Sequence, residues 1–224
     1  KILNSKHPPS IVVNSNGDSP DLLTGDGTAD AGNGEVTLRA AIQEANALTG
    51  YQIVYFYIPG SAPYIIQPGI VLPDITEQVY LDGTVQSGYY GSPVVQINGT
   101  YGKITITGNG STVRGISING STGFSLTLSN SGGNNVFENE IGGVFVSSPN
   151  NSISDNIFYN SVLGVEISDG ADGTVFSANT ISGNTNGIIL NASNFALTQE
   201  NEIFNNIGNG ININGGGNNI SNQI

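Results

Sequence analysis

Three carboxylates in the C-terminal half have the residue type that sugar hydrolysis requires: Asp155, Asp169 and Asp172. A glycoside hydrolase needs two carboxyl groups within roughly 5 to 9.5 Å of each other, one of which acts as the acid. Asp155 and Asp169 would fall on nearby coils of a repeat fold, so they are the candidate catalytic residues of a carbohydrate-active enzyme. The simpler interpretation, which we favour, is that "SDGADG" (168–173) is a turn with solvated carboxylates.

A second acidic group lies in the loop "NSNGDSPDLLTGDGTADAGNGE" (14–35), which is rich in Gly and Asp. Calcium binds six to eight oxygen ligands in flexible geometry, and alternating Asn and Asp side chains can supply them. The loop lacks the Gly and terminal Glu of an EF-hand, so an ordinary polar loop is the main alternative. We therefore expect no required cofactor and name calcium as a candidate, with Asp18, Asp21, Asp26 and Asp30 as its ligands.

The negative net charge limits the classes of molecule that the protein can bind. The chain has 17 acidic and 5 basic residues, for a net charge of -12, which would repel nucleic acid and anionic membranes. No Lys, Arg or His follows Arg114, so a lyase acting on polyuronates would lack cations for its substrate. The single histidine, His7, stands in a polar leader without partners for catalysis or metal binding.

Other functional classes are excluded by residues that the chain lacks. Without Cys, the chain has neither disulfides nor thiolate metal sites. No apolar run approaches the roughly 20 residues that span a bilayer, so we expect no membrane insertion. Four tyrosines could line a sugar-binding surface, although packing in the core or in loops is the favoured role: Tyr80, Tyr89, Tyr90 and Tyr101.

An internal repeat dominates the second half of the chain. Segments rich in Ile, Val and Phe recur at intervals of about 20 residues, and each contains an equivalent asparagine. Leucine does not dominate, and no helix pattern follows residue 50, so a right-handed parallel β-helix fits better than a leucine-rich repeat. At a tight turn, stacked amides can cap backbone N–H groups and bond to one another. The predicted ladder comprises Asn139, Asn156, Asn179, Asn201 and Asn222.

Alternation within the repeats predicts which side chains point inward. In "GIIL" (187–190) and "GINI" (210–213), every second residue is a large aliphatic one that would face the interior. The preceding glycines, Gly164, Gly187 and Gly210, are expected to need a positive φ at a turn.

One segment predicts a helix. In "VTLRAAIQEANALTG" (36–50), Leu38, Ala41, Ile42 and Ala45 form an apolar stripe. Thr37 is the predicted N-cap, and the helix (37–48) would cover one end of the solenoid. We therefore divide the chain into residues 1–52, with a strand, the polar loop and the helix, and residues 53–224, with the coils.

Two stretches resemble a known family. "GDGTADAGNGEVTLRAAIQEANA" (25–47) resembles the signature of the CSLREA-motif proteins, and residues 72–120 are similar to their early coils. These are secreted proteins with a right-handed parallel β-helix of the pectate-lyase-like superfamily. The resemblance implies a helical cap and export to a cell surface or matrix, but no reaction. Members often carry a Cys pair where this chain has Thr28 and Val36, so we expect the loop either to be held in another way or not to need such a link.

These observations favour a non-catalytic extracellular structural or adhesive module of roughly seven or eight coils. The last repeat stops at "NNISNQI", which is expected either of a piece of a longer solenoid or of an open end that docks on another copy. The expected partners are therefore the chain itself, head-to-tail or laterally, or other surface proteins and glycans. The alternative is a carbohydrate-active enzyme or a neutral-glycan-binding module.

Overall fold

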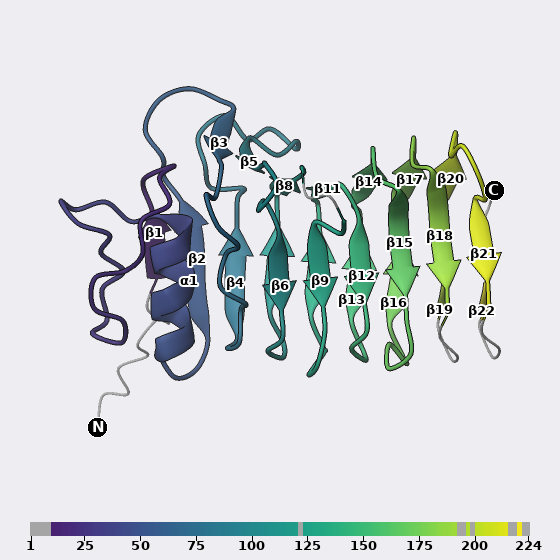
Figure 1. The fold of residues 1–224 in the computed structure, drawn as a ribbon, viewed down its shortest axis with the longest axis horizontal. Helices are drawn as coiled ribbons and strands as arrows, with labels where there is room; N and C mark the ends of the chain where they lie inside the picture. The colour runs from purple at the N-terminus through teal and green to yellow at the C-terminus, as the bar shows by residue number, and fades with distance from the viewer. Residues whose placement is uncertain (1–9, 121–122, 192–195, 198–199, 215–218, 221–224) are drawn as a thin grey trace.

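The protein is a parallel β-helix. The computed structural model describes residues 10–120, 123–191, 196–197, 200–214 and 219–220. Within these residues every paired strand is parallel to its neighbours, and the chain passes repeatedly through three sheets, A, B and C, while its coils stack along one axis (Figure 1). The predicted fold class, an all-β solenoid with one N-terminal helix, is confirmed.

From residue 79 to residue 213, each coil contributes one short strand to each sheet. Among the described residues, sheet A contains nine strands: β1 (Ser10–Val13), β2 (Gln52–Phe56), β4 (Val79–Asp82), β7 (Thr112–Arg114), β10 (Asn135–Phe137), β13 (Ser152–Ser154), β16 (Val175–Ser177), β19 (Ala196–Leu197) and β22 (Asn219–Ile220). Sheet B contains β3 (Tyr64–Ile66), β5 (Val95–Ile97), β8 (Ile116–Ile118), β11 (Glu140–Ile141), β14 (Ile157–Tyr159), β17 (Thr180–Ser182) and β20 (Glu202–Phe204). Sheet C contains β6 (Ile104–Ile106), β9 (Leu126–Leu128), β12 (Val144–Val146), β15 (Leu163–Ile167), β18 (Asn186–Leu190) and β21 (Ile211–Ile213).

The interior is filled by columns of aliphatic and aromatic side chains. Because the strands pair in register, each inward residue stacks on its equivalent in the next coil, as Phe158 does on Ile181 in sheet B. Phe158 of sheet B and Phe176 of sheet A also pack together in the interior, with ring centroids 5.5 Å apart. Ile188 and Leu190 are fully buried, as their alternation predicts. Ile213, predicted to point inward, is 50% exposed, and its strand β21 is the last one of sheet C within the described residues.

The prediction of a positive φ at Gly164, Gly187 and Gly210 was wrong. Gly164 and Gly187 lie inside β15 and β18, and none of the three has a φ in the left-handed region. At Gly187 and Gly164, the close approach of the next coil explains the absence of a side chain, whereas a Cβ on Gly210 would meet only Ile203 at 3.7 Å. A Cβ on Gly187 would lie 2.3 Å from the carbonyl oxygen of Gly210, and one on Gly164 would lie 2.9 Å from that of Gly187.

The helix α1 (Leu38–Ala47) lies at the N-terminal end of the solenoid, beside β1 and β2 (Figure 1). Thr37 is its N-cap, as predicted, and its Oγ1 accepts from the Ala40 N–H at 3.0 Å. The stripe that includes Leu38 and Ile42 is buried. No helix in the described part of the chain has the length and apolarity needed to cross a membrane.

The N-terminal segment is continuous with the coils. β1 pairs with β2 in sheet A, so the first strand belongs to the same sheet as the repeats. The proposed boundary between residues 52 and 53 falls inside β2, which begins at Gln52.

Asparagine side chains connect the coils at the corner between sheets A and B. Asn156 Oδ1 accepts from the backbone N–H and from Nδ2 of Asn139 at 3.1 and 3.0 Å. The Nδ2 group of Asn156 faces three acceptors, Asn179 Oδ1 and the carbonyls of Val136 and Ser154, at 2.8 to 3.0 Å. The same pattern runs through Asn139, Asn156, Asn179 and Asn201, all of them buried. Asn222 lies outside the described residues.

The other two corners carry similar ladders that were not identified from the sequence. Between sheets B and C, the backbone N–H and Nδ2 of Asn184 donate to Asn206 Oδ1 at 3.0 and 3.1 Å. Between sheets C and A, Asn134 Nδ2 donates to Asn151 Oδ1 at 3.2 Å, and the Asn151 N–H donates to Thr174 Oγ1 at 3.3 Å. Side-chain hydrogen bonds therefore join successive coils at all three corners.

We expect Asn156→Ala to lower the free energy of unfolding by roughly 2 to 4 kcal/mol, because it leaves buried backbone groups without partners. Urea unfolding followed by circular dichroism measures this change. The matched control is Asn109→Ala, since Asn109 is exposed and lies outside the ladders. If the two variants unfold at the same urea concentration, the ladder does not stabilise the solenoid.

Candidate functional site

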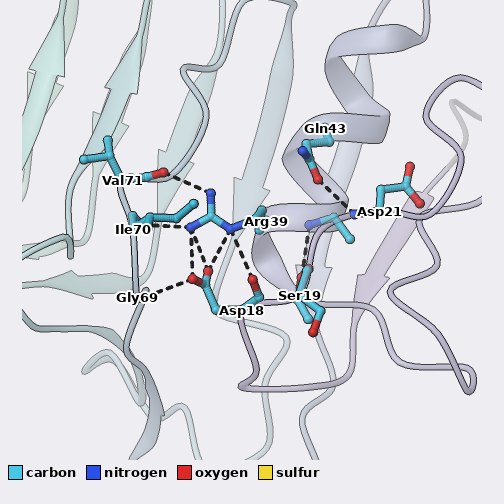
Figure 2. Close-up of polar contacts among 10 residues, drawn as sticks. Asp18, Ser19, Asp21, Arg39, Gln43, Gly69, Ile70 and Val71 are labelled. Carbon is cyan, nitrogen blue, oxygen red and sulfur yellow. Dashed lines mark hydrogen bonds and ion pairs between the residues drawn. The ribbon is translucent and has the colours of Figure 1, made fainter.

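The first of the four candidate calcium ligands, Asp18, is engaged by a buried arginine (Figure 2). Arg39 Nε and Nη2 donate to the two carboxylate oxygens of Asp18 at 3.0 Å each. Arg39 also donates to the carbonyls of Ile70 and Val71 at 2.8 and 2.9 Å, and the Gly69 N–H donates to Asp18 Oδ2 at 2.8 Å. The pair therefore joins the polar loop, the helix and the segment 69–71.

The other three aspartates accept hydrogen bonds from backbone N–H groups within the same loop. Asp21 Oδ1 accepts from the Asp30 N–H at 3.0 Å, Asp26 Oδ1 from Thr28 at 2.8 Å and Asp30 Oδ1 from Gly32 at 2.8 Å. Asp21 Oδ2 is buried and has no hydrogen-bond partner within the described residues. These contacts order the turns of the loop.

A buried glutamate of the helix also holds the loop. Glu44 is fully buried, and its carboxylate accepts from the N–H groups of Gly25 and Gly27. Among the residues that the structure describes, no three His, Cys, Asp or Glu side chains are grouped to hold a metal ion. The structure thus gives calcium no support, and it shows how the loop is held without a disulfide.

The three candidate catalytic aspartates are exposed and do not form one group. Asp155 follows β13 at the corner between sheets A and B. Asp169 and Asp172 precede β16, at the corner between sheets C and A. The strands of sheet A therefore separate Asp155 from the other two. Asp155 lies next to Glu138 of the neighbouring coil, and the Glu138 N–H donates to the Asp155 carbonyl at 3.2 Å.

Glu138 itself belongs to a polar cluster on the outer face of sheet A. Arg114 Nε lies 2.8 Å from Glu138 Oε2, and the guanidinium lies 5.4 Å from the ring centroid of Phe137. Hydrogen bonds with Glu138 and Tyr80 raise the pKa of Arg114. Tyr89 donates to Glu138 Oε2 at 3.3 Å, and burial, followed by the charge of Glu138, raises the pKa of that phenol. This carboxylate is therefore occupied by an ion pair.

A groove of about 700 Å³ lies beside sheet B, where the coils turn toward sheet C. This volume is within the range of roughly 300 to 1,000 Å³ that is usual for small-molecule sites. No acidic or basic side chain lines it in the described part of the chain. Its lining residues are Gln96, Asn98, Ser117, Asn119, Gly120, Gly123, Phe124, Ser125, Gly142, Tyr159, Asn160, Ser161, Val162 and Leu163.

The groove results from a glycine in a column of larger side chains. Asn98, Asn119, Gly142 and Tyr159 each follow the buried residue of a sheet B strand, so they lie in one column on its outer face. Across the gap at Gly142, Asn119 Nδ2 donates to the Tyr159 hydroxyl at 3.0 Å, and it also contacts Ser117 Oγ at 2.9 Å. The amide and the phenol are therefore held in place by the protein.

The protonation state of Tyr159 follows from its surroundings. Burial, with a further contribution from the charge of Glu140, raises the pKa of its phenol. The hydroxyl therefore remains protonated at neutral pH and is available as a neutral donor and acceptor.

The groove was not identified from the sequence. The signal that could have revealed it is the repeated "ING" after two sheet B strands (97–99 and 118–120), followed in the next repeat by "IGG" (141–143). None of the four tyrosines considered for a sugar-binding surface lines this groove. Tyr90 is 95% exposed.

Comparison with known proteins identifies one family. The sequence model of the NosD family, described as periplasmic copper-binding protein (NosD), matches residues 76–223, more than half of the 224-residue chain. No curated protein and no solved structure gives a significant match to the chain.

We expect Arg39→Lys to destabilise the protein by about 2 kcal/mol or more, because an ammonium group cannot replace both bonds to Asp18 and both carbonyl contacts. Thermal unfolding measures the effect. The matched control is Lys103→Arg, which replaces lysine with arginine at a position on the coils, away from the N-terminal loop. If Arg39→Lys melts at the wild-type temperature, the ion pair is not what secures the loop.

Proposed function

Because the chain belongs to the NosD family, we propose that it is a non-catalytic structural and adhesive β-helix module that acts outside the cytoplasm. The description of the family as periplasmic supports the location. Export to a cell surface or matrix, the relationship to CSLREA-motif proteins and self-association belong to the same proposal.

The observation that carries this proposal is the neutral lining of the groove. General acid–base catalysis needs side chains that exchange protons near the working pH, usually His, Asp or Glu. The groove offers amides, hydroxyls and aromatic rings instead. Elsewhere, the buried Arg39 and the partly buried Asp18 form an ion pair that supports the fold. A surface of this kind suits recognition better than bond cleavage.

The second candidate function is a glycoside hydrolase, and one observation favours it. Glu138 and Asp155 occupy equivalent corner positions in adjacent coils, with φ values of 58° and 56°. Two carboxylates on neighbouring coils could serve as acid and base. However, the Glu138 carboxylate is engaged in an ion pair with Arg114 at 2.8 Å, so it is not free to contact a substrate.

We expect no turnover of neutral or uronic-acid polysaccharides by the purified chain. Reducing-end and unsaturated-product assays would detect hydrolysis and elimination, respectively. The matched variants are Asp155→Asn and Glu138→Gln, with Asp169→Asn as the control at the other corner. Turnover that disappears in Asp155→Asn or Glu138→Gln and persists in Asp169→Asn would replace the non-catalytic proposal with the hydrolase.

The copper named in the family description does not fit the residues of this chain. Proteins bind copper mainly through Cys, Met and His side chains. The chain has no Cys, no Met and a single His, His7, which lies outside the described residues. We therefore assign no copper-dependent step to this protein.

We expect the purified chain to retain no copper in competition with a chelator such as bicinchoninate for Cu(I), because the thiolate and thioether ligands are absent. Metal analysis after gel filtration measures retention, and His7→Ala tests the remaining imidazole. One equivalent of copper retained by the wild type would contradict this expectation, and its loss in His7→Ala would identify the ligand.

A further inference from the structure

We propose that the groove beside sheet B binds an uncharged oligosaccharide. This inference rests on the proposed adhesive function and gives it a ligand class and a site. The central residues are Asn98, Asn119, Phe124 and Tyr159, arranged around the gap at Gly142.

The lining matches the chemistry of a neutral sugar. Each sugar hydroxyl both donates and accepts hydrogen bonds, and so do the amide of Asn98 and the hydroxyl of Tyr159. Asn119 offers its Oδ1 as an acceptor, since its Nδ2 already donates to Ser117 and Tyr159. The C–H faces of a sugar ring are apolar and pack on aromatic rings. Phe124 supplies such a ring in the groove, and its centroid lies 5.5 Å from that of Phe145. The combination of a few fixed polar groups with apolar surface is typical of small-molecule sites.

The polar groups are positioned before a ligand arrives. The hydrogen bonds of Asn119 to Ser117 and Tyr159 fix both the amide plane and the phenol. Asn98 Nδ2 donates to Gln96 Oε1 of its own coil at 3.4 Å. Because side chains that are already ordered lose little entropy on binding, this arrangement favours affinity.

The charges around the groove select against acidic sugars. No cation lines the groove to neutralise a uronate carboxylate. Glu140 lies close enough to raise the pKa of Tyr159, so its negative charge would repel a second carboxylate. The net charge of -12 acts in the same direction. The occupant that fits is therefore neutral.

The length of the groove suits an oligomer better than a single sugar. Its lining runs along the solenoid axis from Gln96 on β5 to Leu163 on β15, across successive coils. Strands of neighbouring coils lie about 4.8 Å apart, which is close to the length of one sugar unit in an extended chain. A linear oligosaccharide could therefore present successive rings to successive coils.

Isothermal titration calorimetry of the full chain tests the proposal with cellohexaose, xylohexaose, mannohexaose and chitohexaose, and with hexagalacturonate as the acidic counterpart. We expect saturable binding of at least one neutral hexasaccharide and none of hexagalacturonate. Tyr159→Ala should weaken that binding roughly tenfold or more, because it removes an aromatic contact and a hydrogen-bonding group. Tyr90→Ala, which removes an exposed tyrosine outside the groove, should leave it unchanged.

Two further variants separate binding from folding. Tyr159→Phe keeps the ring and removes only the hydroxyl bonded to Asn119, so it should weaken binding without unfolding the chain. Gly142→Ala narrows the groove, because the new Cβ would lie 2.9 Å from Ser125 Oγ and 3.0 Å from Asn119 Oδ1. Circular dichroism of each variant verifies the fold.

The inference is overturned if none of the four neutral probes binds at millimolar concentration, if hexagalacturonate binds equally well, or if the folded groove variants bind like the wild type. If the chain neither binds nor cleaves these glycans, the proposed glycan site is wrong, whereas the proposed non-catalytic role is unaffected. Turnover of a bound glycan would instead overturn the non-catalytic role and keep the site.

Discussion

The satisfaction of backbone groups at the corners of each coil is the constraint on which this structure depends. A strand of three residues has few backbone hydrogen bonds of its own, and each turn between sheets directs N–H and carbonyl groups toward the interior, where water does not reach them. Stacked Asn and Thr side chains at all three corners supply those partners, as the contacts of Asn156 and Asn184 show. The side chain that caps one coil also bonds to the next, so a single residue type both closes a turn and sets the register.

The same constraint explains the unusual polarity of the chain. Its interior columns need only a few apolar residues per coil, because each coil is covered by its neighbours. The polar residues are therefore structural, and few charges are required. At the N-terminal end of the described coils, α1 lies beside β1 and β2, with its apolar stripe buried. The loop before it is fastened by Asp18, Arg39 and Glu44, which satisfy one another and the nearby backbone. Charged groups thus hold the loop in place without a covalent link.

Repetition made the fold predictable and the groove difficult to predict. Equivalent asparagines recur once per coil, and inward residues such as Ile188 and Leu190 alternate with outward ones. Both patterns reflect interactions between neighbouring coils, so the sequence indicated the solenoid and its inward residues. The helix was indicated by its own apolar stripe and by its cap at Thr37. Glycine is required at position 187 because a side chain there would meet the Gly210 carbonyl of the following coil, and no local sequence pattern reveals this contact. The Arg39–Asp18 pair and the contact between Asn119 and Tyr159 also join residues that are far apart in sequence. Such contacts become visible only when the coils are stacked.

A regular solenoid has few places where a small ligand can be enclosed, because equivalent side chains form continuous columns. A departure from the repeat is therefore the physical origin of a site. Here the departure is Gly142, which interrupts a column between Asn119 and Tyr159 and leaves the two side chains to meet across the gap. Gly142 lies on the outer face, so the buried columns and the ladders continue unbroken beneath it. Recognition on this scaffold can thus change by exchange of outward residues, while the interior that specifies the fold stays the same.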